Sequence, residues 1–259
     1  MLITSASNPK VQRLQKLLRK KKLRQSEGLF VAEGIRLMEE ALKWGVKPVE
    51  LYWGESLSER GFELVESLSP KTDQAYQLSD ALIGKVADTT STQGVVGVFA
   101  MGFIMPVPPQ FILIADQIRD PGNMGTLMRS AKAMGVEGII TTPGTVDAYS
   151  PKVVRSAMGV HFALPVISMD WEQINLMYPK GDVHFWTTVV EGGESILLQE
   201  PRFPIALVVG GEADGVSKLA LERSDVNVTI PMVGKTESLN AGVAGSLALY
   251  EIMCKRLAS

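Results

Sequence analysis

Short apolar runs that alternate with helical stretches dominate the second half of this 259-residue chain. Runs of this kind separated by helices are typical of a parallel sheet that has helices on both faces. We therefore predict an α/β fold for this half. Its expected strands are Phe111–Ala115, Gly138–Thr141, Val183–Thr188, Ile205–Val209 and Val226–Ile230.

The first hundred residues predict a smaller α/β unit. Ser7-Asn8-Pro9 offers a capping residue followed by proline, and apolar residues then recur at helical spacing, which favours a helix over about Pro9–Arg24. Further helices are expected at Glu33–Trp44, Leu57–Leu68 and Ser79–Val86, and strands at Leu29–Ala32, Val49–Trp53, Ala75–Leu78 and Val95–Ala100.

A proline-rich segment separates the two halves. Residues 101–110 hold three prolines and no periodic pattern, which is typical of a linker. A chain of 259 residues is long enough for two modest cores. We predict two domains, residues 1–105 and residues 106–259.

The first expected helix carries a concentrated positive charge, although the net charge of the chain is only −2. Eight basic residues and no acidic one lie between Lys10 and Arg24. Such a face attracts RNA phosphates, and the alternative is a face that only aids solubility. The candidate RNA-binding residues here are Lys10, Arg13, Lys20, Lys21 and Lys22.

Several classes of protein are disfavoured. No apolar run approaches the roughly 20 residues of a membrane helix, and the first residues lack the apolar stretch of a signal peptide, so a cytoplasmic protein is expected. Cys254 is the only cysteine, which excludes an internal disulfide and a cysteine-rich zinc site. His161 and His184 share no motif with a carboxylate, so we expect them to be structural and expect no metal site.

Three segments place glycines and polar residues directly after an apolar strand, where ligands bind in open α/β sheets. In the first, Gly122 and Gly125 permit a tight turn, Asn123 can cap the next helix, and Arg129 lies about two turns inside that helix. Taken alone, this segment is equally compatible with a plain strand-to-helix turn.

The other two segments follow later strands. After Ile205–Val209 comes Gly-Gly-Glu-Ala-Asp-Gly, in which the carboxylate of Glu212 could hold a substrate or a cation. After the last strand, residues 230–240 lead into a helix over Ala241–Leu257 that opens with small residues. Such a helix can approach another backbone closely, in tight packing or in a subunit contact.

In order, these segments read Asp-Pro-Gly-Asn-x-Gly-x-x-x-Arg, Gly-x-Glu-x-x-Gly and Ile-Pro-Met-x-Gly-x-x-x-Ser-Leu-Asn. Together they resemble the three signature motifs of the SpoU (TrmH) family of RNA ribose methyltransferases, in the SPOUT superfamily. The resemblance spans residues 111–257. The N-terminal part more loosely resembles the L30e-like substrate-binding domain that many of these enzymes carry.

The resemblance implies a deep trefoil knot in the second domain, an exception to the rule that chains avoid knots. It also implies a homodimer in which each active site is completed by the partner chain. The cofactor would be S-adenosylmethionine, held by backbone groups around Gly210, Gly211, Ile230, Met232 and Leu239. Arg129 and Asn123 would face the ribose, with Glu212, Ser238 and Asn240 nearby.

Two further positions follow from the resemblance. Residues 149–159 are similar to a segment that follows the first motif in this family, where Arg155 and Ser156 could orient RNA phosphate or ribose, or could be ordinary residues of a solvated helix. Several relatives have a serine two positions after the asparagine of the third motif, whereas this chain has Gly242. Any hydroxyl contact from that position is absent here.

The function implied is methylation of a ribose 2′-hydroxyl, with 23S ribosomal RNA as the expected substrate because the N-terminal extension resembles that of rRNA-modifying relatives. Because guanidinium resists deprotonation, Arg129 is expected to stabilise the developing alkoxide, while the proton leaves to water, a phosphate oxygen or Glu212. Alternatives are a transfer-RNA 2′-O-methyltransferase and a catalytically silent RNA-binding or ribosome-assembly protein. A nucleotide-binding enzyme is disfavoured because the phosphate-loop lysine and the dinucleotide fingerprint are both missing.

Overall fold

The computed structural model of the chain describes residues 2–72, 74–86, 93–102, 105, 109–212, 214–234 and 237–258. They form two compact units, one of Met1–Gly102 with Tyr149–Ala163 and one of Phe103–Ala148 with Leu164–Ser259. The segment 149–163 thus joins the first unit, although it follows the expected boundary near residue 105. The expected linker lies partly outside the described residues, at 103–104 and 106–108.

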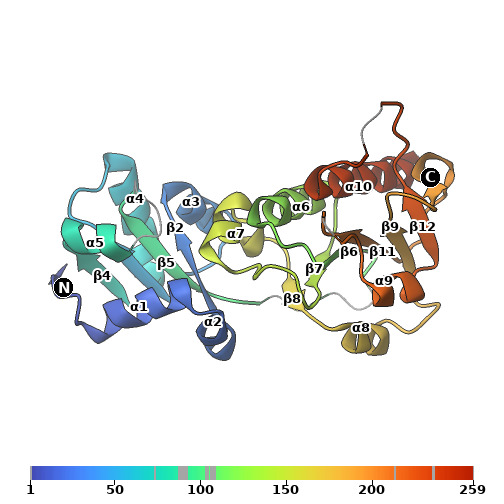
Figure 1. Cartoon of the computed structure of the whole chain (residues 1–259). Coiled ribbons are helices and arrows are strands. Elements are labelled where there is room, and N and C mark those ends of the chain that lie inside the picture. Colours follow the sequence, from blue (N-terminus) through green and yellow to red (C-terminus); the bar gives the residue numbers. More distant parts are fainter. Residues whose placement is uncertain are drawn as a thin grey trace. The chain divides into compact units, whose positions relative to one another are not determined.

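The first unit is built on a five-stranded mixed sheet in the order β1-β4-β3-β5-β2 (Figure 1). β1, β4 and β3 are parallel, and β5 is antiparallel to both of its neighbours. The strands are β1 (Leu2–Ile3), β2 (Leu29–Glu33), β3 (Glu50–Trp53), β4 (Ala75–Leu78) and β5 (Val95–Ala100). The four predicted strands are confirmed to within one residue.

Helices cover both faces of this sheet. α1 (Pro9–Arg19) and α5 (Asp80–Val86) share one apolar core with it. α3 (Ile35–Lys43), α4 (Glu59–Leu68) and α7 (Pro151–Ser156) share the core of the other face. That second core includes Phe30, Phe99 and Phe162, which explains why the segment 149–163 belongs to this unit.

The single helix predicted over Pro9–Arg24 is wrong in one respect, because it breaks at Lys20. Asn8 caps α1 as predicted, and Lys20 then adopts an extended conformation before α2 (Lys21–Glu27) begins. Arg24 is buried and its Nη1 donates to the carbonyls of Leu17 and Leu18. Arg24 thereby satisfies carbonyls that α1 leaves open at its end, which stabilises the break.

The second unit holds a seven-stranded sheet in the order β10-β12-β9-β11-β6-β7-β8, and every described pairing in it is parallel. The strands are β6 (Phe111–Asp116), β7 (Gly138–Thr141), β8 (Val166–Ser168), β9 (His184–Thr188), β10 (Glu194–Ser195), β11 (Ile205–Gly210) and β12 (Val226–Thr229). The predicted α/β fold with a parallel sheet is confirmed. The sequence analysis missed β8 and β10, which have only three and two residues.

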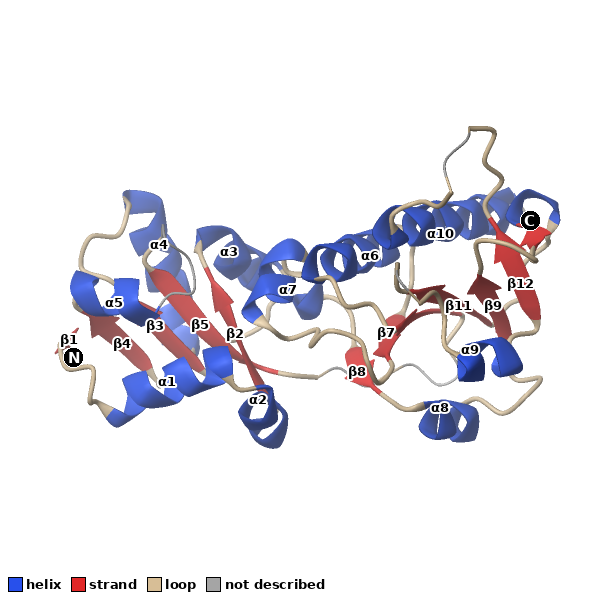
Figure 2. Cartoon of the chain, in the orientation of Figure 1, coloured by secondary structure: helices blue, strands red, loops and turns tan. Residues whose placement is uncertain are grey.

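Helices flank this sheet as well (Figure 2). α6 (Pro121–Ala133) packs against α10 (Ala241–Ala258), while α8 (Trp171–Met177) and α9 (Lys218–Arg223) contribute to the core of the opposite face. The predicted close approach of the last helix is confirmed, because a Cβ on Gly245 would lie 2.2 Å from Leu127 Cδ2 and 3.0 Å from Val209 Cγ1. Among the described residues, we find no helix of the length and apolarity that crossing a membrane requires.

Candidate active site

The three motifs meet at the carboxyl edge of the second sheet. β6 and β11 are neighbours in register, with Asp116 beside Gly210, so the residues that follow both strands emerge side by side. The segments concerned are the first motif (Asp120–Arg129), the second motif (Gly210–Gly215) and the third motif (Ile230–Asn240), of which Ala213, Lys235 and Thr236 lie outside the described residues. Ligands bind at this edge in parallel α/β sheets.

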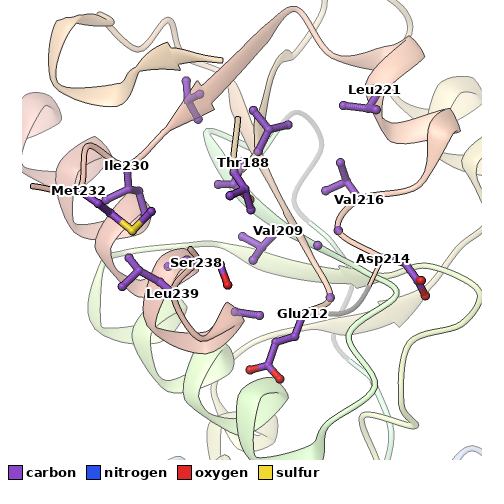
Figure 3. A pocket seen from close by; sticks show the side chains of 18 residues that line it. Thr188, Val209, Glu212, Asp214, Val216, Leu221, Ile230, Met232, Ser238 and Leu239 are labelled. Atoms are coloured by element: carbon purple, nitrogen blue, oxygen red, sulfur yellow. The ribbon is translucent and has the colours of Figure 1, made fainter. Parts of the chain in front are cut away.

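A cavity of about 380 Å³ opens at this edge (Figure 3). Its lining is mainly apolar, with a few polar groups, as in sites for small organic ligands. It includes all five residues predicted to hold the cofactor, which are Gly210, Gly211, Ile230, Met232 and Leu239. Glu212 and Ser238 line the same cavity.

The sequence analysis missed a fourth side of this cavity. The cavity is also lined by the end of β9, the strand that pairs with β11. The residues concerned are Thr188, the last of β9, and Val189 and Val190, which follow it. The signal was present, because the apolar strand Val183–Thr188 is followed by Gly192 and Gly193, as the other motif strands are followed by glycines.

The second motif is a tight turn that leaves no room for a side chain at Gly210. Gly211 and Gly215 exchange two backbone hydrogen bonds, of 3.0 and 3.1 Å, and Gly215 has φ +66°. A Cβ on Gly210 would lie 2.4 Å from the carbonyl carbon of Gly215. The wall of the cavity is therefore backbone here, which lets a ligand bond to peptide groups.

Replacing Gly210 with alanine should therefore damage the cavity. We expect the free energy of unfolding to fall by roughly 1–3 kcal/mol, as for overpacked cores, together with loss of binding at this cavity. Thermal unfolding and calorimetric titration with S-adenosylmethionine measure the two effects. Gly234→Ala is the matched control, because a Cβ there meets nothing within 4 Å; equal behaviour of the two variants would contradict the prediction.

A hydrogen-bonded carboxylate and two amides lie beside the cavity. Asn123 Nδ2 donates to Glu212 Oε1 at 2.9 Å, and Asn240 Nδ2 reaches Asn123 Oδ1 at 2.8 Å and Glu212 Oε1 at 2.5 Å. The structure thus brings one predicted catalytic residue from each motif into a single network. Within the described residues, Glu212 Oε2 carries no hydrogen bond.

The prediction that Asn123 caps the helix of the first motif is wrong. α6 begins at Pro121, and Asp120 caps it by accepting from the backbone N–H of Asn123 at 2.8 Å. The helix starts earlier because proline fits its first position. Asn123 is therefore already helical and nine-tenths buried, and its side-chain amide is free to bond to Glu212.

Two predicted catalytic residues lie outside this network. Ser238 lines the cavity, and Arg129 does not. Arg129 lies on α6, two turns after the helix begins, and is exposed. In the part of the chain that the structure describes, its guanidinium has no hydrogen-bond or ion-pair partner. In the part of the chain that is described, Arg129 is thus not bonded to Glu212, whose partners are Asn123 and Asn240.

Gly242, the departure from the family pattern, lies where α10 meets α6. A Cβ here would be 3.2 Å from Thr126 Cβ and 3.3 Å from the Cα of Asn123. These distances are tighter than ordinary van der Waals contact. Glycine at this position lets the start of α10 lie close to the first motif.

Next to the site lies a buried carboxylate, Asp116, that the sequence analysis missed. Asp116 is 1% exposed at the end of β6. Its Oδ1 accepts from Thr142 Oγ1 at 2.6 Å and from Trp171 Nε1 at 3.2 Å, and its Oδ2 accepts from the N–H of Ser217 at 2.5 Å. One acidic residue at the end of an otherwise apolar strand was the available signal.

The candidate RNA-binding residues of the first unit differ in their surroundings. Lys20, Lys21 and Lys22 are exposed. Lys10 lies over the ring of Tyr76, 4.3 Å from its centre, and Arg13 forms ion pairs with Glu27 and Glu50.

Tyr52 and Ser156 of the first unit also form hydrogen bonds with neighbouring groups. Burial, together with the Glu50 carboxylate, raises the pKa of the Tyr52 hydroxyl, which donates to Glu50 at 2.6 Å. Ser156 Oγ donates to the carbonyl of Val153 in α7, the helix that also holds Arg155. Of the two histidines, His161 lies among aromatic rings in the first unit, and His184 accepts from Trp186 in the second.

Comparison with known proteins gives matches over nearly the whole chain. The SpoU rRNA Methylase family model matches residues 110–250, and the MRM3-like substrate binding domain matches residues 8–97. The 23S rRNA (guanosine(2553)-2′-O)-methyltransferase RlmP of Bacillus subtilis is 32% identical over 96% of this chain and 98% of its own length. The 23S rRNA (uridine(2479)-2′-O)-methyltransferase of Streptomyces viridochromogenes is 30% identical over 98% of this chain and 92% of its own length. A crystal structure of AdoMet-bound rRNA methyltransferase from Sinorhizobium meliloti has a TM-score of 0.85 and 27% identity, and covers 100% of this chain and 99% of that one.

Proposed function

Because the chain belongs to the SpoU rRNA methylase family, we propose that it transfers a methyl group from S-adenosylmethionine to a ribose 2′-hydroxyl of 23S ribosomal RNA. The observation that carries this proposal is the pairing of a nucleoside-sized cavity with the Asn123–Glu212–Asn240 network beside it. We also propose that the protein is cytoplasmic.

The cavity fits the proposed cofactor. Its volume of about 380 Å³ and apolar walls suit a nucleoside, and the glycine backbone of the second motif offers peptide groups to a purine. The carboxylate of Glu212 suits a positively charged sulfonium. S-adenosylmethionine bound there would supply an activated methyl group.

The chain's own residues would hold the acceptor. The two amides fix the orientation of Glu212 through Oε1, which leaves Oε2 to accept the hydrogen of the 2′-hydroxyl. Holding that oxygen in line with the methyl group would supply much of the rate. Arg129 would stabilise the negative charge that develops on the same oxygen.

A homodimer would complete the site. Val243, Leu247 and Tyr250 are about half exposed on α10, and Leu257 is 79% exposed; their spacing places them along one side of the helix. An apolar stripe of this kind is suited to burial against a second copy of the chain. The partner would then bring its Arg129 to the Glu212 network.

Disrupting this stripe should separate the subunits. We expect Leu247→Asp combined with Tyr250→Asp to yield a monomer in analytical ultracentrifugation and to lower methyl transfer at least tenfold, since Arg129 no longer reaches the site. Leu176→Asp on α8 is the control, because Leu176 is 83% exposed on another helix. A double variant that stays dimeric would show that the stripe is not the interface.

We also propose two features of the fold, a trefoil knot in the second unit and an L30e-like fold in the first. The proposal of a trefoil knot rests on the match of residues 110–250 to the SpoU family. The L30e-like character of residues 1–105 is supported by the match of residues 8–97 to a substrate-binding domain. We therefore assign RNA capture to the first unit and methyl transfer to the second unit.

The proposed function is tested with radiolabelled S-adenosylmethionine and two unmodified RNAs in parallel, 23S ribosomal RNA and bulk transfer RNA. Label at a ribose 2′-oxygen of the ribosomal RNA is the expected result. Label in transfer RNA alone would contradict the proposal that 23S ribosomal RNA is the substrate. If the protein binds the cofactor but labels neither RNA nor isolated ribosomal particles, a catalytically silent RNA-binding protein would be favoured.

The basic residues around the helix break should contribute phosphate contacts. We expect the triple variant Lys20→Gln, Lys21→Gln and Lys22→Gln to weaken RNA binding and to reduce the slope of log affinity against log salt by about two to three, since each lost phosphate contact lowers it by about one. Neutralising Lys43, Lys47 and Lys71, which are exposed on other parts of the unit, provides the control. An unchanged slope in the first triple variant would assign these lysines to solubility alone.

A further inference from the structure

A second cavity of about 140 Å³ adjoins the first. The two share part of their lining, which is Gly211, Glu212, Asp214 and Ala241. The second cavity is completed by the strand end and first motif, through Gln117, Ile118, Arg119, Asp120 and Asn123. Because Asn123 and Glu212 line it, the second cavity also touches the Asn123–Glu212 network.

The charges around this second cavity are mostly negative. Asp120, Glu212 and Asp214 line it, and of its described lining residues only Arg119 is positively charged. A polyanion such as RNA would be repelled by three carboxylates. An RNA strand that places its ribose at Glu212 therefore needs a nearby cation, and Arg119 is the cation available at this rim.

Arg119 has a single, weak partner in the chain. Its Nη2 lies 2.7 Å from Asp214 Oδ2, and the two side chains are 66% and 58% exposed. Exposed ion pairs of this kind contribute little to stability. Within the described residues the guanidinium has no other partner, so its remaining donors are available to a phosphate, which it can bind with two parallel bonds.

The backbone holds Arg119 in place. Gln117 has φ +58°, a conformation that is unfavourable for a non-glycine residue and persists only where the surroundings favour it. The second motif lies close to this residue, because a Cβ on Gly211 would lie 2.5 Å from the Gln117 carbonyl oxygen. Ile118 is buried and its carbonyl accepts from the N–H of Val146, so the residue before Arg119 is anchored.

We propose that Arg119 is an RNA-binding residue that takes the phosphate flanking the acceptor nucleotide, and that Asp214 is its partner only while RNA is absent. This inference rests on the proposed function and deepens it, since it names Arg119 as the residue whose positive charge lets the RNA strand approach the carboxylates of the second cavity. Binding of the phosphate replaces the Arg119–Asp214 pair with a charge-assisted bidentate pair.

The test compares Arg119→Gln with the wild-type chain at saturating S-adenosylmethionine. We expect the KM for 23S ribosomal RNA to rise roughly tenfold, as for one lost charged hydrogen-bond pair, with a smaller change in kcat. The salt slope of RNA binding should fall by about one. The dissociation constant for S-adenosylmethionine should stay within twofold, because Arg119 does not line the first cavity. Arg202→Gln, another exposed arginine of the same unit, is the matched control.

The variant Asp214→Asn tests whether the Arg119–Asp214 pair only links the first and second motifs or whether Asp214 competes with RNA for Arg119. If Asp214 competes with RNA, the variant binds RNA as tightly as the wild type or more tightly. If the pair only bridges the motifs, both variants share one defect and the salt slope stays unchanged, which would overturn the inference. Absence of methyl transfer by the wild-type chain would instead overturn the proposed function, whereas normal wild-type transfer with an unaltered Arg119→Gln variant would overturn the role of Arg119 alone.

Discussion

Replacing Arg129 with alanine is expected to lower methyl transfer at saturating RNA by about 10²–10³-fold, the range found when one donor to a developing oxyanion is removed. Arg129 is exposed on α6, so the substitution leaves no buried group unpaired and should leave the fold intact. The affinity for S-adenosylmethionine should change less than threefold, because Arg129 does not line the cofactor cavity. Single-turnover kinetics and calorimetry measure the two quantities.

The variant Arg129→Lys tests whether methyl transfer needs the planar guanidinium group or only a positive charge at this position. Lysine keeps the positive charge but cannot offer two parallel donors, so a large loss is expected here too. Nearly full turnover of Arg129→Lys with saturating RNA would contradict a role for the guanidinium.

Mixing two inactive variants tests whether Arg129 acts across the dimer. If each site combines Glu212 of one subunit with Arg129 of the other, a heterodimer of Arg129→Ala and Glu212→Gln subunits holds one intact site. Co-expression should then restore activity toward half of the wild-type value per intact dimer. No recovery in isolated heterodimers would place both residues in the same subunit's site.

Replacing Asp116 with alanine is expected to lower the free energy of unfolding by roughly 3–5 kcal/mol, since each buried donor left without an acceptor costs about 1–3 kcal/mol. Three donors would be left, from the side chains of Thr142 and Trp171 and the backbone of Ser217. Ser217 caps α9 and follows Val216 in the cavity wall, so S-adenosylmethionine affinity should fall as well.

Chemical denaturation of Asp116→Ala measures this loss, with Asp182→Ala as the control because Asp182 is exposed. Asp116→Asn should lie between Asp116→Ala and the wild type, since it keeps the volume and one acceptor. A loss below about 1 kcal/mol in Asp116→Ala would show that water replaces the carboxylate and that the three donors are not held by it.

The sequence by itself determined most of the helices and strands and, through its motifs, part of the cofactor cavity. Strands such as Gly138–Thr141 and Val95–Ala100 were predicted at their observed bounds because apolar runs and turn residues are local signals. The resemblance of the three motifs to the SpoU family implied five lining residues of the cavity, which are Gly210, Gly211, Ile230, Met232 and Leu239. Parallel strands share one carboxyl edge, so their position along the chain was enough to bring them together.

Only the tertiary structure decided how side chains from distant segments pair. It gave Asp120 the capping role, which releases the Asn123 amide for Glu212, and it set the buried Asp116 among donors from three segments. It also joined the segment 149–163 to the first unit and ended α1 at Arg19 through the buried Arg24. These outcomes depend on packing between residues far apart in the chain, whose energies local propensity does not contain.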